Sequence, residues 1–392
     1  MLSQRAFSNT NLFLLAFTYF CYFGHVGAIV PYLGVFLDSR GFSSVEIGQL
    51  SALITLTRIV GPHLWSSFTD SSGKNLRMLQ LGCFLSLCCF SLVLWSESFW
   101  ALSIAIGLMM MFVTAILPQI EVITLSCVKG QGNRYGRIRL WGSIGYILLT
   151  VATGAMIDRY STEAPVYITL LILLTLFLST FLLTEPQSSG KAKKLTQTVW
   201  PLLKTPTFIG FILSGILLQM SFGPYYSFFA LYAKDLGYSG QATGWLIATG
   251  VMVEVGIFVI AGGLIKRFGA KRLLIISMLL TSVRWGLLAF FAEHLYWLLF
   301  SQMLHAFSFG MAHAASIYFI HHYFGKKFQS RGQAIYMSLA FGVGGAVGGY
   351  AAGEFWHQGS GAELTFLLAS IAAFLAMICL LPINRKRMDG AL

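Results

Sequence analysis

The chain has 392 residues, of which 56% are hydrophobic and only 10% are charged, and its mean hydropathy is +0.74. Water-soluble domains carry about 25% charged residues, so a soluble protein of this length could not bury so much apolar surface. Apolar runs of the roughly 18 residues or more that cross a bilayer recur along the whole chain. The composition therefore excludes a soluble enzyme, a nucleic-acid binder and a secreted disulfide-rich scaffold.

The apolar runs predict an all-α membrane protein with twelve transmembrane helices in two pseudo-symmetric six-helix bundles. In chain order the predicted helices are Leu12–Leu37, Val45–Phe68, Leu76–Trp95, Phe99–Val128, Ile138–Ile157, Pro165–Thr184, Phe208–Ala233, Ala242–Ile265, Leu273–Ala292, Tyr296–Tyr323, Ala334–Gly353 and Leu364–Pro382. Pro31 and Pro224 should bend the first and seventh of them, because proline removes a backbone donor.

The distribution of positive charge predicts the orientation. The net charge is +12, and 21 of the 26 lysines and arginines lie in the terminal segments and in alternate loops that share one side. The loops of the other side hold three, Arg40, Arg159 and Lys234. Because basic loops resist translocation, we expect both termini to be cytoplasmic and the protein to lie in the inner (cytoplasmic) membrane. The excess charge is thus a topology signal, and we expect no nucleic-acid partner.

The second half of the chain repeats the first at an offset of 196 residues. Four glycines show it: Gly41, Gly48, Gly73 and Gly136 correspond to Gly237, Gly244, Gly269 and Gly332. A polar, basic stretch separates the repeats, which predicts an N-terminal bundle at 1–184, a cytoplasmic linker at 185–205 and a C-terminal bundle with a cytoplasmic tail at 206–392. Two parallel six-helix repeats are typical of alternating-access transporters.

Two loops that we expect in the cytoplasm carry copies of one motif. The first has Ser66, Asp70, Gly73 and Lys74, and the second has Gly262, Lys266, Arg267, Gly269, Lys271 and Arg272. Both resemble the signature of the major facilitator superfamily, Gly-x3-Asp-Arg/Lys-x-Gly with trailing basic residues, although Lys266 replaces the acid in the second copy. We predict a gating role for Asp70, Gly73, Arg267 and Gly269, in which the acid latches onto the N-terminus of a neighbouring helix.

Ionisable residues inside the apolar runs are functional candidates, because each costs about 2.5 kcal/mol or more at the centre of a bilayer. They are Arg58, Glu121, Arg139, Glu254 and Arg284, together with His25, His305 and His313. Pairing reduces the cost of burying charge, which predicts the pairs Glu121–Arg139 and Glu254–Arg284. Glycines at every fourth position, Gly345, Gly349 and Gly353, predict a closely packed helix.

Three runs resemble the phenylpropionate permease family, a branch of the superfamily close to the lactose permease. They are Arg134–Tyr146, Arg58–Trp65 and Gly223–Phe229. The resemblance extends over essentially the whole chain, and it implies a small aromatic carboxylate such as 3-phenylpropionate as substrate. Arg58, Arg139 or Arg284 could hold such a carboxylate in a bidentate fork.

The lactose permease comparison assigns further roles. Glu121 and Arg139 fall where that protein has its sugar-binding acid and arginine, and Tyr146 takes the place of the tryptophan that stacks on the sugar. Glu254, Arg284 and His305 match the acid, arginine and histidine of its C-terminal half. Two positions depart from it: Ser308 stands where the permease has its proton-carrying glutamate, and Gln302 where it has a lysine. Glu254 then becomes the predicted proton carrier, with His305 as its relay.

The sequence therefore predicts a proton-coupled symporter that functions as a monomer in membrane lipid and binds a small molecule and a proton. Predicted substrate-binding residues are Arg58, Glu121, Arg139, Tyr146, His25, Tyr225 and Tyr226, and predicted proton-coupling residues are Glu254, Arg284 and His305. The six cysteines lack the spacing of metal ligands, so we expect no metal, no cofactor and no enzymatic activity. A sugar or nucleoside symporter remains an alternative, as does a membrane receptor or assembly factor that transports nothing.

Overall fold

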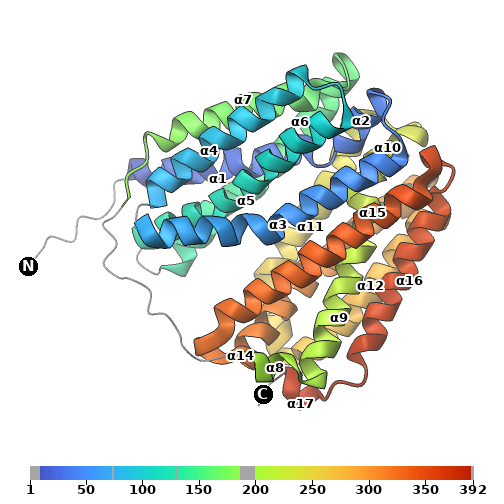
Figure 1. The fold of residues 1–392 in the computed structure, drawn as a ribbon. Helices are drawn as coiled ribbons and strands as arrows, with labels where there is room; N and C mark the ends of the chain where they lie inside the picture. The colour runs from blue at the N-terminus through green and yellow to red at the C-terminus, as the bar shows by residue number, and fades with distance from the viewer. Residues whose placement is uncertain (1–8, 73–74, 129–130, 186–198, 390–392) are drawn as a thin grey trace, which may run out of the picture. The chain divides into compact units, whose positions relative to one another are not determined.

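The computed structural model describes residues 9–72, 75–128, 131–185 and 199–389, without the side chains at positions 9, 58, 62–64, 66–72 and 326. Within these ranges the chain is helical, and no strand is present (Figure 1). Contacts divide the chain into two compact units. Unit 1 comprises Met1–Leu33 and Thr57–Lys194, and unit 2 comprises Gly34–Leu56 and Leu195–Leu392. The division at a linker over 185–205 stays a prediction.

Unit 1 contains the helices of the first half of the chain. They are α1 (Asn9–Ile29), the second part of α3 (Ser44–Ser72), α4 (Asn75–Ser91), the 3₁₀ turn η1 (Leu92–Trp95), α5 (Phe99–Val128), α6 (Gly132–Arg159) and α7 (Ala164–Thr180). Two glycines hold α1 against α6: a Cβ on Gly27 would lie 2.5 Å from the Tyr146 carbonyl oxygen, and one on Gly145 would collide with the Phe20 carbonyl. Thr150 Oγ1 also donates to the Gly27 carbonyl across 3.0 Å.

Unit 2 contains α2 (Leu33–Ser39), the first part of α3 and every later helix. The later helices are α8 (Trp200–Leu203), α9 (Pro206–Ser221), α10 (Gly223–Asp235), α11 (Gly240–Phe268), α12 (Ala270–Phe290), α13 (Leu295–Met303), the π-helix η2 (Ala306–Met311), α14 (Ala312–Tyr336), the π-helix η3 (Met337–Gly344), α15 (Gly345–Trp356), the 3₁₀ turn η4 (His357–Gly359), α16 (Ala362–Leu380) and α17 (Arg385–Asp389).

The predicted glycine stripe packs as expected. In unit 2, a Cβ on Gly353 of α15 would lie 2.7 Å from the Ser44 carbonyl oxygen and 2.8 Å from Cα of Gly48, both in α3. Gly349 and Gly345 continue this contact along α3. The two backbones approach this closely because none of the three glycines carries a side chain. The structure confirms the predicted close packing of this helix.

Prolines and one glycine interrupt the predicted membrane helices. Pro31 lies in the turn between α1 and α2, and Pro224 begins α10 directly after α9 ends, which confirms both predicted bends. The tenth predicted helix ends at Tyr323, whereas α14 continues to Tyr336 through a kink at Gly325, where φ is +60°. The apolar span Leu295–Gly325 ends at this glycine, two residues beyond the predicted end of the tenth helix.

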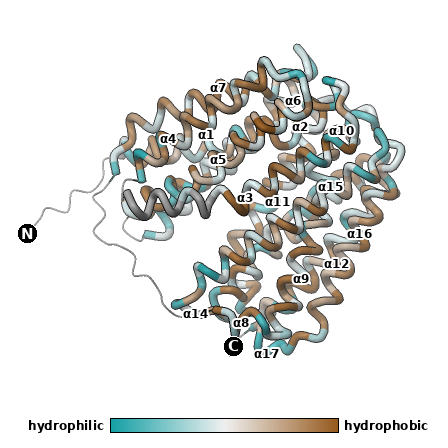
Figure 2. Tube along the Cα trace, viewed as in Figure 1, coloured by the Kyte–Doolittle hydropathy of each residue, from teal (hydrophilic) through white to brown (hydrophobic). Residues whose placement is uncertain are grey.

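Ten helical segments of the described ranges are long and apolar enough to cross a membrane. They are Thr10–Ile29, Asn75–Trp95, Phe99–Val128, Gly132–Arg159, Pro206–Asp235, Gly240–Phe268, Ala270–Phe290, Leu295–Gly325, Lys327–Gly359 and Ala362–Leu380. A shorter apolar helix covers Ala164–Thr180. Figure 2 shows the apolar colouring along these helices and hydrophilic colouring at α17. The described residues thus confirm the all-helical prediction and contain ten candidate membrane spans.

Candidate functional site

Glu254, His305 and Arg284 form a hydrogen-bonded chain within unit 2. Glu254 lies in α11, Arg284 in α12, and His305 at the junction of α13 with η2. His305 Nε2 lies 3.1 Å from Glu254 Oε2, and His305 Nδ1 lies 2.9 Å from Arg284 Nη1. The predicted direct pair of Glu254 with Arg284 is not among the described ion pairs, because the imidazole of His305 stands between the two charges.

These two contacts fix the protonation of the imidazole. A guanidinium carries only donors, so Arg284 donates to His305 Nδ1, which accepts only when it holds no proton. The ring hydrogen is then on Nε2, from which it is donated to the carboxylate of Glu254. A second proton on His305 would break its bond with Arg284.

Arg284 is completely buried among aromatic rings. Its Cζ lies 4.3 Å from the ring centroid of Trp285, 4.4 Å from that of Tyr225 and 5.7 Å from that of Phe222. Among the described residues, Arg284 Nε and Nη2 have no hydrogen-bond partner. These two atoms form the side-on pair of donors that binds a carboxylate in a bidentate manner. Burying donors without partners is costly.

Neutral hydrogen bonds hold the aromatic rings around Arg284. The hydroxyl of Tyr225 donates to Gln302 Oε1 across 2.9 Å, and Gln302 Nε2 donates to Ser301 Oγ across 3.0 Å. Trp285 Nε1 donates to Ser221 Oγ across 3.0 Å. Sequence reasoning missed Trp285, although it directly follows Arg284 in the chain. It noticed Gln302 only as a departure from the lactose permease.

Two glycines allow α11 to pack closely against the segment that carries His305. A Cβ on Gly310, in η2, would lie 2.6 Å from Ile257 Cγ2 and 3.0 Å from Glu254 Cγ. A Cβ on Gly250, in α11, would lie 3.2 Å from His305 Cβ. The π-helical turn of η2 begins directly after His305, and such turns are frequent at functional sites. The glycines and the widened turn together let α11 approach closely enough for Glu254 to contact His305.

The polar residues of unit 1 are arranged differently. The hydroxyl of Tyr135 lies 3.5 Å from Glu121 Oε1, at the outer limit of a hydrogen bond. The guanidinium of Arg139 lies 3.8 Å from the ring centroid of Phe23 and 5.8 Å from that of Tyr19. The predicted Glu121–Arg139 pair is absent from the ion pairs of the described chain. Each charged group is therefore set beside an aromatic side chain.

The other predicted binding residues occupy separate places. His25 is completely buried in α1, its ring edge-on to Tyr22 with 5.3 Å between centroids, and neither ring nitrogen has a hydrogen-bond partner within the described residues. Tyr146 is half-buried on α6, beside Gly27. Tyr226 is 39% exposed and stacks on Phe222. Tyr225 contacts the Glu254–His305–Arg284 chain through its ring, which lies against Arg284.

His313 and the gating residues complete the predicted set. The ring of His313 stacks on Phe309, with 6.0 Å between centroids. Gly269 separates α11 from α12 with φ at +86°, a conformation that favours glycine. Arg267 is exposed, with its guanidinium 5.2 Å from the Phe268 ring. The side chains of Arg58 and Asp70, and the whole of Gly73, lie outside the described residues.

Comparisons with known proteins agree with this fold. Residues 12–368 match the model of the MFS_1 like family. The "Probable 3-phenylpropionic acid transporter" of Escherichia coli (strain K12) is 29% identical over 368 residues, which are 91% of this chain and 94% of the relative. The "Maltose permease" of Geobacillus stearothermophilus is 29% identical over 386 residues, which are 95% of this chain and 94% of the relative.

A solved structure shows the same fold. The "Crystal structure of nucleoside transporter NupG" superimposes with a TM-score of 0.81 at 17% sequence identity, covering 96% of this chain and 99% of that one. Identity this low supports the fold and nothing about the substrate. The family match, by contrast, covers most of the chain and identifies a transporter rather than an enzyme. The chain therefore belongs to the MFS_1 like family of major facilitator membrane transporters.

Proposed function

We propose that the protein is a proton-coupled symporter that takes up a small aromatic carboxylate such as 3-phenylpropionate by alternating access. The observation that carries the proposal is the Glu254–His305–Arg284 chain, which joins a carboxylate that can accept a proton to an arginine with an unused pair of donors. The relative whose name refers to 3-phenylpropionic acid supports this substrate class.

The charges of the Glu254–His305–Arg284 chain explain how proton and substrate would be coupled. With Glu254 ionised and no substrate bound, its charge balances that of Arg284. Protonation of Glu254 leaves Arg284 with an uncompensated positive charge, which the carboxylate of the substrate neutralises. Because an unbalanced charge at the bilayer centre costs about 2.5–3.5 kcal/mol, the empty and the fully loaded forms reorient most readily. The proposal therefore couples one proton to each carboxylate.

Substrate recognition would use arginine and aromatic side chains together. A carboxylate that accepts hydrogen bonds from Arg284 Nε and Nη2 would lie beside the rings of Tyr225 and Trp285, which offer flat surfaces for an aromatic substrate. We further propose binding roles for the remaining predicted residues. They are Arg58, Arg139, Tyr146, His25 and Tyr226, and Glu121 would bind where the substrate carries hydroxyl groups.

We also propose the finer topology. The helices α3 (Ser44–Ser72) and α7 (Ala164–Thr180) would add two spans to the ten apolar segments, giving twelve. Both termini and the linker at 185–205 would be cytoplasmic, and the protein would act as a monomer in the inner membrane. The alternation of basic loops supports this orientation. Asp70, Gly73, Arg267 and Gly269 would take part in gating.

A sugar or nucleoside symporter is the second candidate. Glu121 and Arg139 are each placed beside an aromatic ring rather than paired with one another, an arrangement able to bind hydroxyl groups and stack on a ring. The maltose permease among the relatives favours the same reading. On that candidate, Glu121 and Arg139 would hold the substrate, and the Glu254–His305–Arg284 chain would serve proton coupling alone.

The test is the change of external pH when substrates are added to lightly buffered, de-energised cells that express the protein. The panel contains 3-phenylpropionate, cinnamate, their hydroxylated analogues, galactosides and nucleosides. Alkalinisation with the aromatic carboxylates alone supports the proposal, and alkalinisation with galactosides or nucleosides supports the second candidate. Silence across the panel overturns the proposed coupling and favours a membrane protein with a receptor or assembly role.

A further inference from the structure

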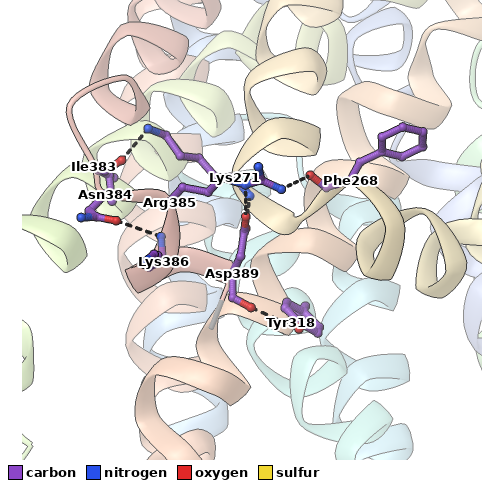
Figure 3. Close-up of polar contacts among 8 residues, drawn as sticks. All are labelled: Phe268, Lys271, Tyr318, Ile383, Asn384, Arg385, Lys386 and Asp389. Carbon is purple, nitrogen blue, oxygen red and sulfur yellow. Dashed lines mark hydrogen bonds and ion pairs between the residues drawn. The ribbon is translucent and has the colours of Figure 1, made fainter. Parts of the chain in front are cut away.

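The segment after α16 is bound tightly to the start of α12. We call Leu381–Asp389 the strap; it comprises a turn and the short helix α17 (Figure 3). The carboxylate of Asp389 is 3% exposed and accepts two hydrogen bonds, one from the backbone N–H of Lys271 across 2.8 Å and one from Arg385 Nε across 2.9 Å. Lys271 Nζ donates in turn to the Leu381 carbonyl across 2.8 Å and to the Ile383 carbonyl. The strap is therefore fixed at both of its ends.

The strap connects three helices at one end of unit 2. It holds α12 through the backbone of Lys271. It contacts α11 through Arg385 Nη2, which donates to the Phe268 carbonyl across 3.3 Å, and α14 through the hydroxyl of Tyr318, which donates to the Asp389 carbonyl across 3.4 Å (Figure 3). One short segment thus ties together the end of α11, the start of α12 and the interior of α14.

The same three helical segments carry Glu254, Arg284 and His305. Lys271 precedes Arg284 by 13 residues, Phe268 follows Glu254 by 14, and Tyr318 follows His305 by 13. At 1.5 Å per residue, each anchor lies about 20 Å along its segment from the charged group. The strap therefore contacts the three segments at nearly the same level, and a shift of one segment against the others would change the 2.9–3.1 Å contacts of the chain.

The position of Asp389 also resolves the departure in the second loop motif. Lys266 stands where the motif has its acid, but a Cβ on Gly269 would collide with the carboxylate of Asp389. The motif glycine therefore leaves room for an acid that comes from the strap. Unit 1 shows a comparable arrangement: Glu185 accepts from the backbone N–H of Leu76 across 2.9 Å and from Asn75 Nδ2 across 2.6 Å. In both units, an acid from beyond the last long helix caps the helix that follows the motif loop.

We propose that the strap is a register clamp and that Asp389 is a positioning residue for the Glu254–His305–Arg284 chain. By holding α11, α12 and α14 at a fixed axial offset, Asp389 keeps His305 within hydrogen-bond distance of both its partners. The inference rests on the proposed function, because it assumes that the chain couples proton to substrate. It assigns to the C-terminal segment a part in coupling.

The test uses the full-length protein with Asp389→Asn, which keeps the size of the side chain and removes its charge. Arg387→Gln is the matched control, since Arg387 is an exposed residue of the same segment. Amide hydrogen exchange is followed in the first turn of α12, together with uphill accumulation and counterflow of 3-phenylpropionate in proteoliposomes. We expect exchange about fivefold faster, as for a lost helix cap, and accumulation reduced relative to counterflow. Asp389→Glu should keep both the exchange rate and the accumulation at the level of the parent protein, because a glutamate, Glu185, makes the equivalent contact in unit 1.

The outcomes separate the clamp from the proposed function. Faster exchange with accumulation unchanged overturns the clamp, since Asp389 would then be only structural, and unchanged exchange overturns it as well. Glu254→Gln is measured alongside: if it abolishes accumulation while Asp389→Asn does not alter it, the clamp fails and the proposed function stands. If Glu254→Gln leaves accumulation intact, both fail. Should Asp389→Asn not fold, Arg385→Gln removes the contacts to Asp389 and Phe268 and carries the same expectations.

Discussion

The charged residues inside the apolar helices make different contacts in the two units. In unit 2, an acid and an arginine are joined through one imidazole, with contacts of 3.1 Å and 2.9 Å. In unit 1, the acid lies near a tyrosine hydroxyl and the arginine lies against a phenylalanine ring. A continuous chain of donors and acceptors is suited to holding and releasing a proton, whereas separated charges beside aromatic rings are suited to binding a ligand. The two units therefore differ in how their charged residues are connected.

The ends of the motif loops show the converse. In each unit a carboxylate from beyond the last long helix accepts a hydrogen bond from a backbone N–H at the start of the helix that follows the motif loop. The carboxylate is that of Glu185, bonded to Leu76, in unit 1 and that of Asp389, bonded to Lys271, in unit 2. This capping contact is therefore shared by the two units, although Lys266 stands in place of the acid in the second loop motif. The contacts of the charged residues inside the apolar helices differ between the units.

Replacing the proton acceptor of unit 2 should have the largest effect. Glu254→Gln cannot ionise, so it should abolish uphill accumulation of substrate while counterflow, which needs no net proton movement, continues. Both are measured as radiolabelled 3-phenylpropionate in proteoliposomes, with and without an imposed pH gradient. Equal loss of accumulation and counterflow would instead assign Glu254 to substrate binding or folding.

Replacing the arginine of unit 2 should have the next largest effect. Arg284→Lys keeps the positive charge but removes the planar side-on pair of donors, so the KM for an aromatic carboxylate should rise about tenfold or more. The kinetics of counterflow give the KM without the proton gradient. An unchanged KM would show that the carboxylate is held elsewhere, and would direct attention to Arg139 in unit 1.

Removal of the hydrogen bond between Tyr225 and Gln302 should have a smaller effect. Tyr225→Phe removes the donor to Gln302 and leaves a buried acceptor unpaired, which should raise KM about fivefold, the equivalent of one hydrogen bond. Gln302→Leu should have a similar effect, and the double variant should be no worse than either single one, since all three remove the same bond. Additive effects would show that the two residues act independently.

Replacing Glu121, the acid of unit 1, should have the smallest effect on the transport of a carboxylate substrate. Glu121→Gln should change both the KM for 3-phenylpropionate and the accumulation ratio by less than about twofold. Glu121 belongs to no described hydrogen-bonded chain like that of unit 2, and its negative charge and that of the substrate carboxylate repel each other. The same kinetic assay on galactosides tests the second candidate. A large loss of galactoside or nucleoside transport in this variant would favour that candidate over the aromatic carboxylate.

The sequence predicted the coarse architecture and the charged residues but not their connections. Apolar runs located the helices, and Pro31 and Pro224 located two breaks, because these signals act locally along the chain. Glu254, Arg284 and His305 were recognisable because charge and imidazole are rare inside apolar runs. The place of His305 between the other two was not predicted, because it depends on the relative rotation of three helices.

Two further features of the site had no distinctive signal in the sequence. The ring of Trp285 against Arg284 could not be separated from ordinary packing in a chain that is 15% aromatic. Asp389 follows three basic residues in the predicted cytoplasmic tail, where a single acid has no distinctive pattern. Its role depends on the strap reaching the start of α12, a contact between residues 118 positions apart. Such long-range contacts follow from helix packing rather than from local pattern.

The central claim is that the proton is carried by unit 2 and not by unit 1. The most direct measurement is substrate-induced alkalinisation outside de-energised cells that express equal amounts of the parent protein, Glu254→Gln or Glu121→Gln, on addition of 3-phenylpropionate. The account predicts alkalinisation with the parent and with Glu121→Gln, and none with Glu254→Gln. Alkalinisation that persists in Glu254→Gln, or that is lost in Glu121→Gln, would contradict it.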